Sequence, residues 1–166
     1  MASATSSQDS PNGAPLLAQA LGGLVKFKDI KPLWPTAAAT PEFALPFYKY
    51  CDSAQPNIAR GVPPAVLSQE LRLITGVCQP GQGMPLHNHT GEELMFAASG
   101  TWVIYFDEAE SAKVHLDRWD AIVVPGGVTR GWRNIGRDTG CLLNISAITD
   151  QMTMTRPAKG EKAPSP

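Results

Sequence analysis

Between residues 65 and 149, short runs of strand-forming residues alternate with turn residues, and this spacing constrains the fold more than any other feature. Turn signals recur about every 8 to 12 residues, which is typical of a sandwich or barrel of antiparallel strands. The dipeptide Ser99-Gly100 suits a hairpin turn between two such runs. Strands are predicted at residues 66–78, 86–89, 92–98, 101–106, 113–116, 121–124, 129–134 and 140–149.

The remaining sequence divides into appendages around this all-β domain, which we place at residues 65–150. Residues 1–25 begin with a Ser-, Ala-, Pro- and Gly-rich stretch and are predicted to be disordered or weakly helical. Residues 26–64 are dense in proline yet carry many aromatic side chains, so we expect an extended arm with short edge strands that packs on the barrel or on a partner subunit. Residues 151–166 are expected to form a flexible tail.

Charge and hydropathy exclude several classes of function. The 14 basic and 15 acidic residues give a net charge of −1, so nothing in the charge balance predicts nucleic-acid binding. No apolar run is long enough to span a membrane, and the N-terminus lacks the basic start of a signal peptide, so we expect a cytoplasmic protein. The three cysteines form no CxxC pair, which argues against a disulfide framework or a thiolate zinc site.

His87, His89 and Glu93 form the pattern with the clearest chemical meaning. In an extended segment the i, i+2 spacing of the histidines puts both imidazoles on one face, and Glu93 shares their parity. Two imidazoles and one carboxylate form a ligand set that leaves coordination positions open and suits non-haem Fe(II), while Mn, Ni, Zn or Co also fit these donors. A hydrogen-bonded polar cluster without a metal is the alternative that the residues alone leave open.

Residues 81–100 resemble the first motif of the cupin superfamily, G-x5-H-x-H-x3-E-x6-G, with every fixed position and spacing in agreement. Residues 119–134 resemble the second motif, G-x5-P-x-G-x2-H-x3-N, and keep Pro125, Gly127, Asn134 and all the spacings. The resemblance implies an RmlC-like double-stranded β-helix, that is, a jelly-roll barrel with its metal site in the mouth. It also implies one bound divalent transition metal, Fe(II) foremost, and a homodimer.

By the same resemblance, the chain is expected to be a metal-dependent oxidoreductase of the dioxygenase type that acts on a small organic acid or phenolic compound. Relatives with the same ligands also perform isomerase, decarboxylase or lyase chemistry. The alternative is a non-catalytic cupin that binds a small anionic ligand, because one fold hosts many functions.

The sequence departs from the second motif at two positions. Trp119 replaces the opening glycine, so we expect the turn there to be rebuilt. Arg130 replaces the histidine that would be the fourth ligand, and a guanidinium has no lone pair to offer a metal. Arg130 therefore has three interpretations: it contacts an anionic substrate inside the barrel, it pairs with Glu93 in a pocket without metal, or it lies on the solvent-exposed rim.

Strand parity extends the list of candidate substrate-binding residues. Arg130, Trp132 and Asn134 share one face of the predicted strand, so if one of them faces the cavity the others do too. Trp132 would then form a stacking wall, although ordinary core packing is the alternative. Tyr105 would supply a hydroxyl group for orienting a substrate if its strand turns that face inward.

Overall fold

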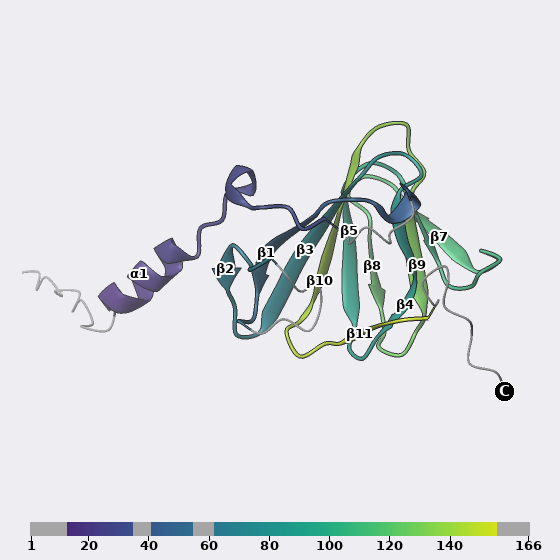
Figure 1. Ribbon diagram of the computed structural model, residues 1–166. Coiled ribbons are helices and arrows are strands. Elements are labelled where there is room, and N and C mark those ends of the chain that lie inside the picture. The colour runs from purple at the N-terminus through teal and green to yellow at the C-terminus, as the bar shows by residue number, and fades with distance from the viewer. Residues whose placement is uncertain (1–12, 35–40, 55–61, 156–166) are drawn as a thin grey trace, which may run out of the picture.

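The computed structural model describes residues 13–34, 41–54 and 62–155, and in it two antiparallel-rich sheets face each other as a barrel (Figure 1). One sheet has six strands in the order β2-β1-β3-β10-β5-β8, and the other has five in the order β11-β4-β9-β6-β7. The all-β jelly-roll architecture is thereby confirmed. The strands are β1 (Phe47–Asp52), β2 (Val66–Leu67), β3 (Leu71–Cys78), β4 (Gly83–His89), β5 (Glu93–Ser99), β6 (Trp102–Tyr105), β7 (Lys113–Leu116), β8 (Ala121–Val124), β9 (Arg130–Asn134), β10 (Gly140–Ala147) and β11 (Met152–Met154).

The inner surface of the barrel is apolar at one end and polar at the other. Along β5 the inward-facing residues change from Ala97 through Met95 to Glu93, and all three are buried. The register pairs Glu93 with Ser146 of β10, and Ser146 in turn with Arg72 of β3, so the polar residues lie at one level. The apolar end is a cluster of Leu45, Cys78, Met95, Ala97, Trp102, Ile104, Leu116, Val124, Trp132 and Leu142. The buried charged residues therefore lie at one end of the barrel, and the apolar cluster fills the other end.

The connection at Ser99-Gly100 corrects the hairpin prediction. Gly100 has a φ of +87°, so the chain does turn there. However, β5 pairs with β10 and β8, whereas β6 pairs with β7 and β9 in the other sheet. The turn therefore carries the chain from one sheet to the other, a choice that depends on long-range pairing rather than on the turn residues.

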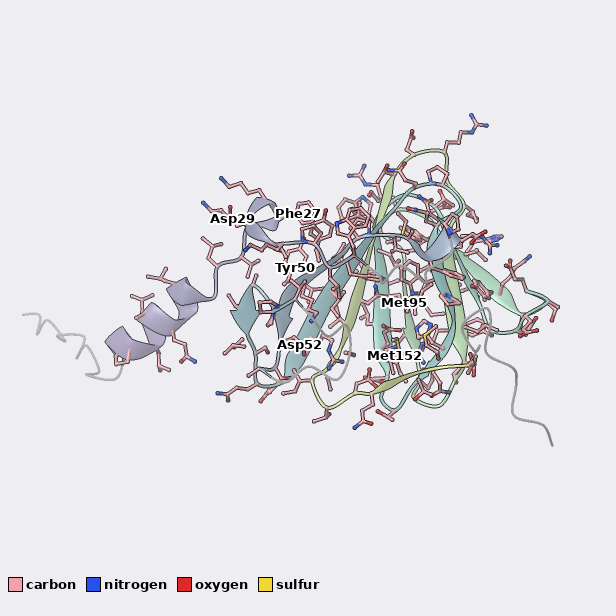
Figure 2. The ribbon with its side chains drawn as sticks, viewed as in Figure 1. Phe27, Asp29, Tyr50, Asp52, Met95 and Met152 are labelled. Atoms are coloured by element: carbon pink, nitrogen blue, oxygen red, sulfur yellow. The ribbon has the colours of Figure 1, made fainter. Side chains whose placement is uncertain are left out.

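The segment before the barrel contributes a strand as well as a covering layer. It contains the α-helix α1 (Gly13–Gly22), the short 3-10 helices η1 (Phe27–Asp29) and η2 (Pro41–Phe43), and β1. β1 pairs with β3 inside the six-stranded sheet, while α1 lies beyond the β2 edge of the barrel (Figure 1). Phe27 packs on Tyr48 and Tyr50, with ring centroids 4.6 and 6.3 Å apart, and Figure 2 shows Phe27 beside Tyr50. Within the described residues, no helix has the length and apolar character needed to cross a bilayer.

Two boundaries differ from those read from the sequence. The predicted strand at residues 66–78 is divided into β2 and β3, because the Ser68 hydroxyl accepts a hydrogen bond from the Leu71 N–H and bends the chain. Residues 152–154, which were expected to belong to a flexible tail, form β11 on the edge of β4. Backbone pairing with His87 and His89 orders this part of the chain although its side chains are mainly polar or exposed.

The turn at Trp119 keeps the backbone conformation that favours glycine, so the expectation of a rebuilt turn was wrong. Trp119 has a φ of +80°, and the Trp119 N–H donates to the carbonyl of Ala97 over 2.8 Å. Its indole is exposed, and the Cζ of Arg118 lies 4.7 Å from the ring centroid. The large side chain is accommodated because it points into solvent, whereas the backbone strain remains.

Candidate metal centre

His87, His89 and Glu93 converge at the polar end of the barrel. Alternation along β4 turns both histidines inward, and β5 begins at Glu93 immediately after a short turn. One ligand atom from each residue lies within 4.8 Å of the others, and the side chains are all buried. The sequence-predicted ligand set is therefore assembled in one place, by two strands that belong to different sheets.

His87 is held in the tautomer that leaves Nε2 free. Its Nδ1 lies 2.7 Å from the carbonyl oxygen of Pro85, which can only accept, so Nδ1 carries the proton and donates. Burial lowers the pKa of His87 to about 3, with the His89 and Arg130 charges acting in the same direction. The imidazole is thus neutral at physiological pH, and Nε2 can offer its lone pair to a metal without first losing a proton.

Asp150 fixes His89 in the same way and is a site residue that the sequence did not reveal. Its Oδ2 accepts a hydrogen bond from Nδ1 of His89, while its Oδ1 accepts from the Gly91 N–H at 2.9 Å and the Thr90 hydroxyl at 3.2 Å. Burial raises the pKa of Asp150, but these donors outweigh burial and the net shift is downward. The result is a carboxylate–histidine pair of the kind that orients metal-binding imidazoles.

Arg72 holds the β10–β11 loop that delivers Asp150. The guanidinium is 2% exposed, and its Nε lies 3.2 Å from Oδ1 of Asp52. Its remaining nitrogens donate to the hydroxyl of Ser146 and to the carbonyls of Ala147, Ile148 and Asp150 at 3.0 to 3.4 Å. Nη1 also lies 3.9 Å from the Asp150 carboxylate. One buried cation therefore connects the loop to β1 in the six-stranded sheet. Figure 2 labels Asp52, the β1 residue of this network.

Arg130 lies inside the barrel, which rules out the interpretation that placed it on the rim. It is 0% exposed, and in the β4–β9 register it is the direct partner of His87. Its Nε lies 3.2 Å from Oε2 of Glu93, and its Nη1 donates to the Val128 carbonyl at 2.8 Å. Its Nη2 is buried and has no hydrogen-bond partner among the described residues. Burial raises the pKa of Glu93, although His89 and Arg130 oppose that shift.

The other candidate substrate-binding residues do not gather around Glu93. Trp132 faces inward but belongs to the apolar cluster, where it packs edge-on against Trp102 with ring centroids 5.8 Å apart. Asn134 donates its amide to the carbonyls of Cys78 and Asp138, so it ties β3 to the turn after β9. Tyr105 pairs with Gly131, on the opposite face of β9 from Arg130, and its hydroxyl donates to the Met84 carbonyl at 3.1 Å. Their roles toward a substrate stay predictions.

The donors present fit a divalent transition metal. Both Nδ1 atoms are engaged elsewhere, so His87 and His89 can each present Nε2, and Nε2 of His89 already lies 3.8 Å from Oε1 of Glu93. Imidazole nitrogen with carboxylate oxygen is the donor combination of non-haem Fe(II) sites and also binds Mn, Ni, Zn or Co. Because Oε2 of Glu93 is bonded to Arg130, the carboxylate has Oε1 left to bind a metal.

Comparison with known proteins identifies the domain. A sequence model described as "Cupin domain" matches residues 76–146, which include both motifs. No curated protein matches the chain.

Solved structures agree on the fold. The polyketide cyclase RemF from Streptomyces resistomycificus superimposes with a TM-score of 0.58 at 15% identity, over 82% of this chain and 87% of that one. An uncharacterized conserved protein with a double-stranded beta-helix domain from Klebsiella pneumoniae gives a TM-score of 0.53 at 12% identity, over 81% of this chain and 97% of that one. The oxalate decarboxylase of Lactobacillus farciminis gives a TM-score of 0.55 at 20% identity, over 77% of this chain but 34% of that one. With its two-sheet barrel and a His-His-Glu cluster in the first motif, the part of the chain matched by the model, residues 76–146, is a cupin domain.

Proposed function

We propose that this cupin is a metal-dependent oxidoreductase of the dioxygenase type that acts on a small organic acid or phenolic compound. The observation that carries the proposal is the buried cluster of His87, His89 and Glu93, with both imidazoles held by their Nδ1 atoms and free at Nε2. A structural polar cluster has no need for two imidazoles fixed in this tautomer. Among the metals that suit these donors, Fe(II) is our first choice.

A bound metal would supply Lewis acidity and open coordination positions for oxygen and substrate. The chain's own residues supply the surroundings. Burial of the ligands excludes bulk water, and Asp150 keeps the His89 ring oriented. The unpartnered Nη2 of Arg130 offers a fixed hydrogen-bond donor beside Glu93, and a guanidinium matches the oxygens of a carboxylate. This donor supports an anionic substrate over a neutral one.

The fold is known to carry enzymes, because solved structures that share it include a polyketide cyclase and an oxalate decarboxylase. At 15% and 20% identity to this chain, these structures support the shared fold only, and the reaction has to be tested. The dioxygenase assignment depends on the ligand set, which is that of open-site Fe(II) oxygenases.

Metal analysis of untagged protein, grown with Fe, Mn, Ni, Zn and Co supplied, tests the proposal. We expect close to one equivalent of one transition metal, and less than about 0.2 equivalents of every metal would refute the enzyme assignment. His89→Ala should abolish this occupancy, while the exposed His115→Ala serves as a matched control. Oxygen consumption by the Fe(II)-loaded protein over a panel of hydroxy acids, dicarboxylates and catechols then tests the reaction class.

A second candidate function is a non-catalytic cupin that binds a small anion. The ion pair between Arg130 and Glu93 favours it, because a guanidinium 3.2 Å from the carboxylate partly replaces the charge of a metal. Under this alternative, the protein binds an anion in the presence of a strong chelator and retains no metal. Binding of malonate to chelator-treated protein at full affinity, with no metal recovered, would select it.

We also propose a homodimer, as the family resemblance implies. Leu16, Leu17 and Leu21 of α1 are 60 to 70% exposed in the single chain, so the helix has apolar surface available for a second copy. Sedimentation velocity at micromolar concentration checks this proposal, and a single species at the mass of one chain would contradict it.

A further inference from the structure

We propose that the metal and a small dianionic chelating ligand, of the dicarboxylate class, bind this site cooperatively, each tightening the binding of the other. The inference rests on the proposed metal site and adds the charge class of its ligand. It originates from Arg130, which stands where the family motif has a fourth, neutral ligand.

Arg130 places a permanent positive charge next to the candidate metal ligands His87 and Glu93. Its guanidinium has no exposed surface, lies 3.2 Å from the Glu93 carboxylate and shares a register position with His87. Arginine stays protonated at every physiological pH. A dication bound by His87, His89 and Glu93 is therefore repelled by a neighbouring cation, and the like charges interact strongly because little water screens them.

The buried charges of the barrel are balanced before a metal binds. Among the described residues, the buried acids Asp52, Glu93 and Asp150 match the buried bases Lys49, Arg72 and Arg130 in number. A divalent metal adds two positive charges to this interior without a protein group to offset them. Uncompensated buried charge is costly, so an incoming ligand with two negative charges restores the balance.

The same arginine offers the group that would hold such a ligand. Nε and Nη1 of Arg130 are used by Glu93 and by the Val128 carbonyl, whereas Nη2 is buried without a partner in the described part of the chain. An unsatisfied buried donor costs free energy, and an anionic oxygen removes that cost with a charge-assisted hydrogen bond. Three protein ligands also leave positions on the metal for a chelating ligand. In the proposed complex, one oxyanion group would bind the metal and another would accept the hydrogen bond of Nη2 of Arg130.

Isothermal titration of the full-length, metal-free protein with Co(II) tests the coupling. Titrations are run in malonate and in malonamide, its uncharged counterpart, with malonate complexation of free Co(II) subtracted from a protein-free titration. We expect the Co(II) dissociation constant to be at least about tenfold lower in malonate, within the usual range of coupling between two ligands. By linkage, Co(II) must tighten malonate binding by the same factor.

Two variants locate the effect. Arg130→Gln removes the charge and keeps a donor, so we expect it to bind Co(II) more tightly than wild type in malonamide and to lose most of the coupling. Arg133→Gln is the matched control on the same strand: Arg133 pairs with Glu110 at the surface, so this variant should retain the wild-type coupling. Circular dichroism and thermal unfolding verify that both variants are folded.

Stoichiometric Co(II) binding by wild type with the same affinity in malonate and malonamide would overturn the inference and leave the metal site standing. Full coupling in Arg130→Gln would overturn it as well, because the guanidinium would then not be its source. Absence of Co(II) binding under both conditions would overturn the metal site and, with it, the inference.

Discussion

Asp150 accepts a hydrogen bond from Nδ1 of His89 across a sequence separation of 61 residues. This contact joins the loop after β10 to the inner face of β4, so one of the three candidate ligands is oriented by a residue outside both cupin motifs. Arg72 in turn holds the loop that carries Asp150. The candidate metal site of this chain is therefore built from four separate segments: β4, β5, the loop after β10 and β3.

Removing the Asp150 carboxylate should weaken metal binding. In Asp150→Ala the His89 ring is free to rotate and to change tautomer, so we expect the affinity for Co(II) or Zn(II) to fall by about 10- to 100-fold. Asp150→Asn, which keeps an acceptor oxygen without the charge, should lie between the two. Isothermal titration measures this, with Asp138→Asn at an exposed position as the control. An affinity in Asp150→Ala equal to that of wild type would show that the contact does not support the ligand.

Arg72→Met should destabilise the folded protein by about 3 to 5 kcal/mol, because it leaves the buried Asp52 carboxylate without its cation. The carbonyls of Ala147, at the end of β10, and of Ile148 and Asp150, in the loop that follows, would lose their donors at the same time. Urea unfolding of the metal-free protein measures the change. Arg118→Met, at an exposed arginine over Trp119, is the control and should cost less than about 0.5 kcal/mol. Comparable losses in the two variants would contradict the network described here.

Arg130→His should raise the metal affinity, because it restores an imidazole at the motif position directly opposite His87 and removes a positive charge. Arg130→Gln separates these two causes, since it removes the charge without adding a ligand. We expect the Zn(II) affinity to increase in the order wild type, Arg130→Gln, Arg130→His. If Arg130→His bound no more tightly than Arg130→Gln, position 130 would not be a ligand position.

Metal-free protein should lose stability in mild acid because of His87. Its pKa is lowered by burial from 6.5 to about 3, so the folded state stays neutral where the unfolded state binds a proton. The free energy of unfolding therefore falls as the pH drops below 6.5, and this contribution ends near pH 3. Between about pH 6 and about pH 4, the wild-type slope should exceed that of His87→Gln by up to about 1.4 kcal/mol per unit. Urea unfolding at several pH values gives both slopes, and parallel curves would contradict the assignment.

Trp119→Gly should be more stable than Trp119→Ala by about 1 kcal/mol, because the backbone at this position has a φ of +80°. Both variants lose the contacts of the indole with Phe96 and Arg118, so their difference isolates the backbone term. Thermal and urea unfolding provide the comparison. Equal stability would mean that the turn relaxes once the indole is removed.

The candidate ligands could be predicted because they depend on local geometry. Alternation along a strand puts His87 and His89 on one face whatever the rest of the chain does, and Glu93 keeps the same parity after a short turn. The hairpin at Ser99-Gly100 was predicted with equally local evidence and was wrong, because a turn reverses the chain without choosing the sheet that receives it. Local sequence signals therefore predict which face of a strand a residue occupies more securely than they predict which strands pair with each other.

The sequence by itself determined the all-β barrel, the cupin motifs and the inward face that carries His87, His89 and Glu93, since these follow from spacing along the chain. Tertiary structure alone decided that Arg130 is buried against Glu93, and that Asp150 and Arg72 complete the site. These contacts join residues that are distant in sequence, and they depend on the twist and register of two sheets. Whether a charged side chain meets solvent or a carboxylate is fixed only when those sheets close around it.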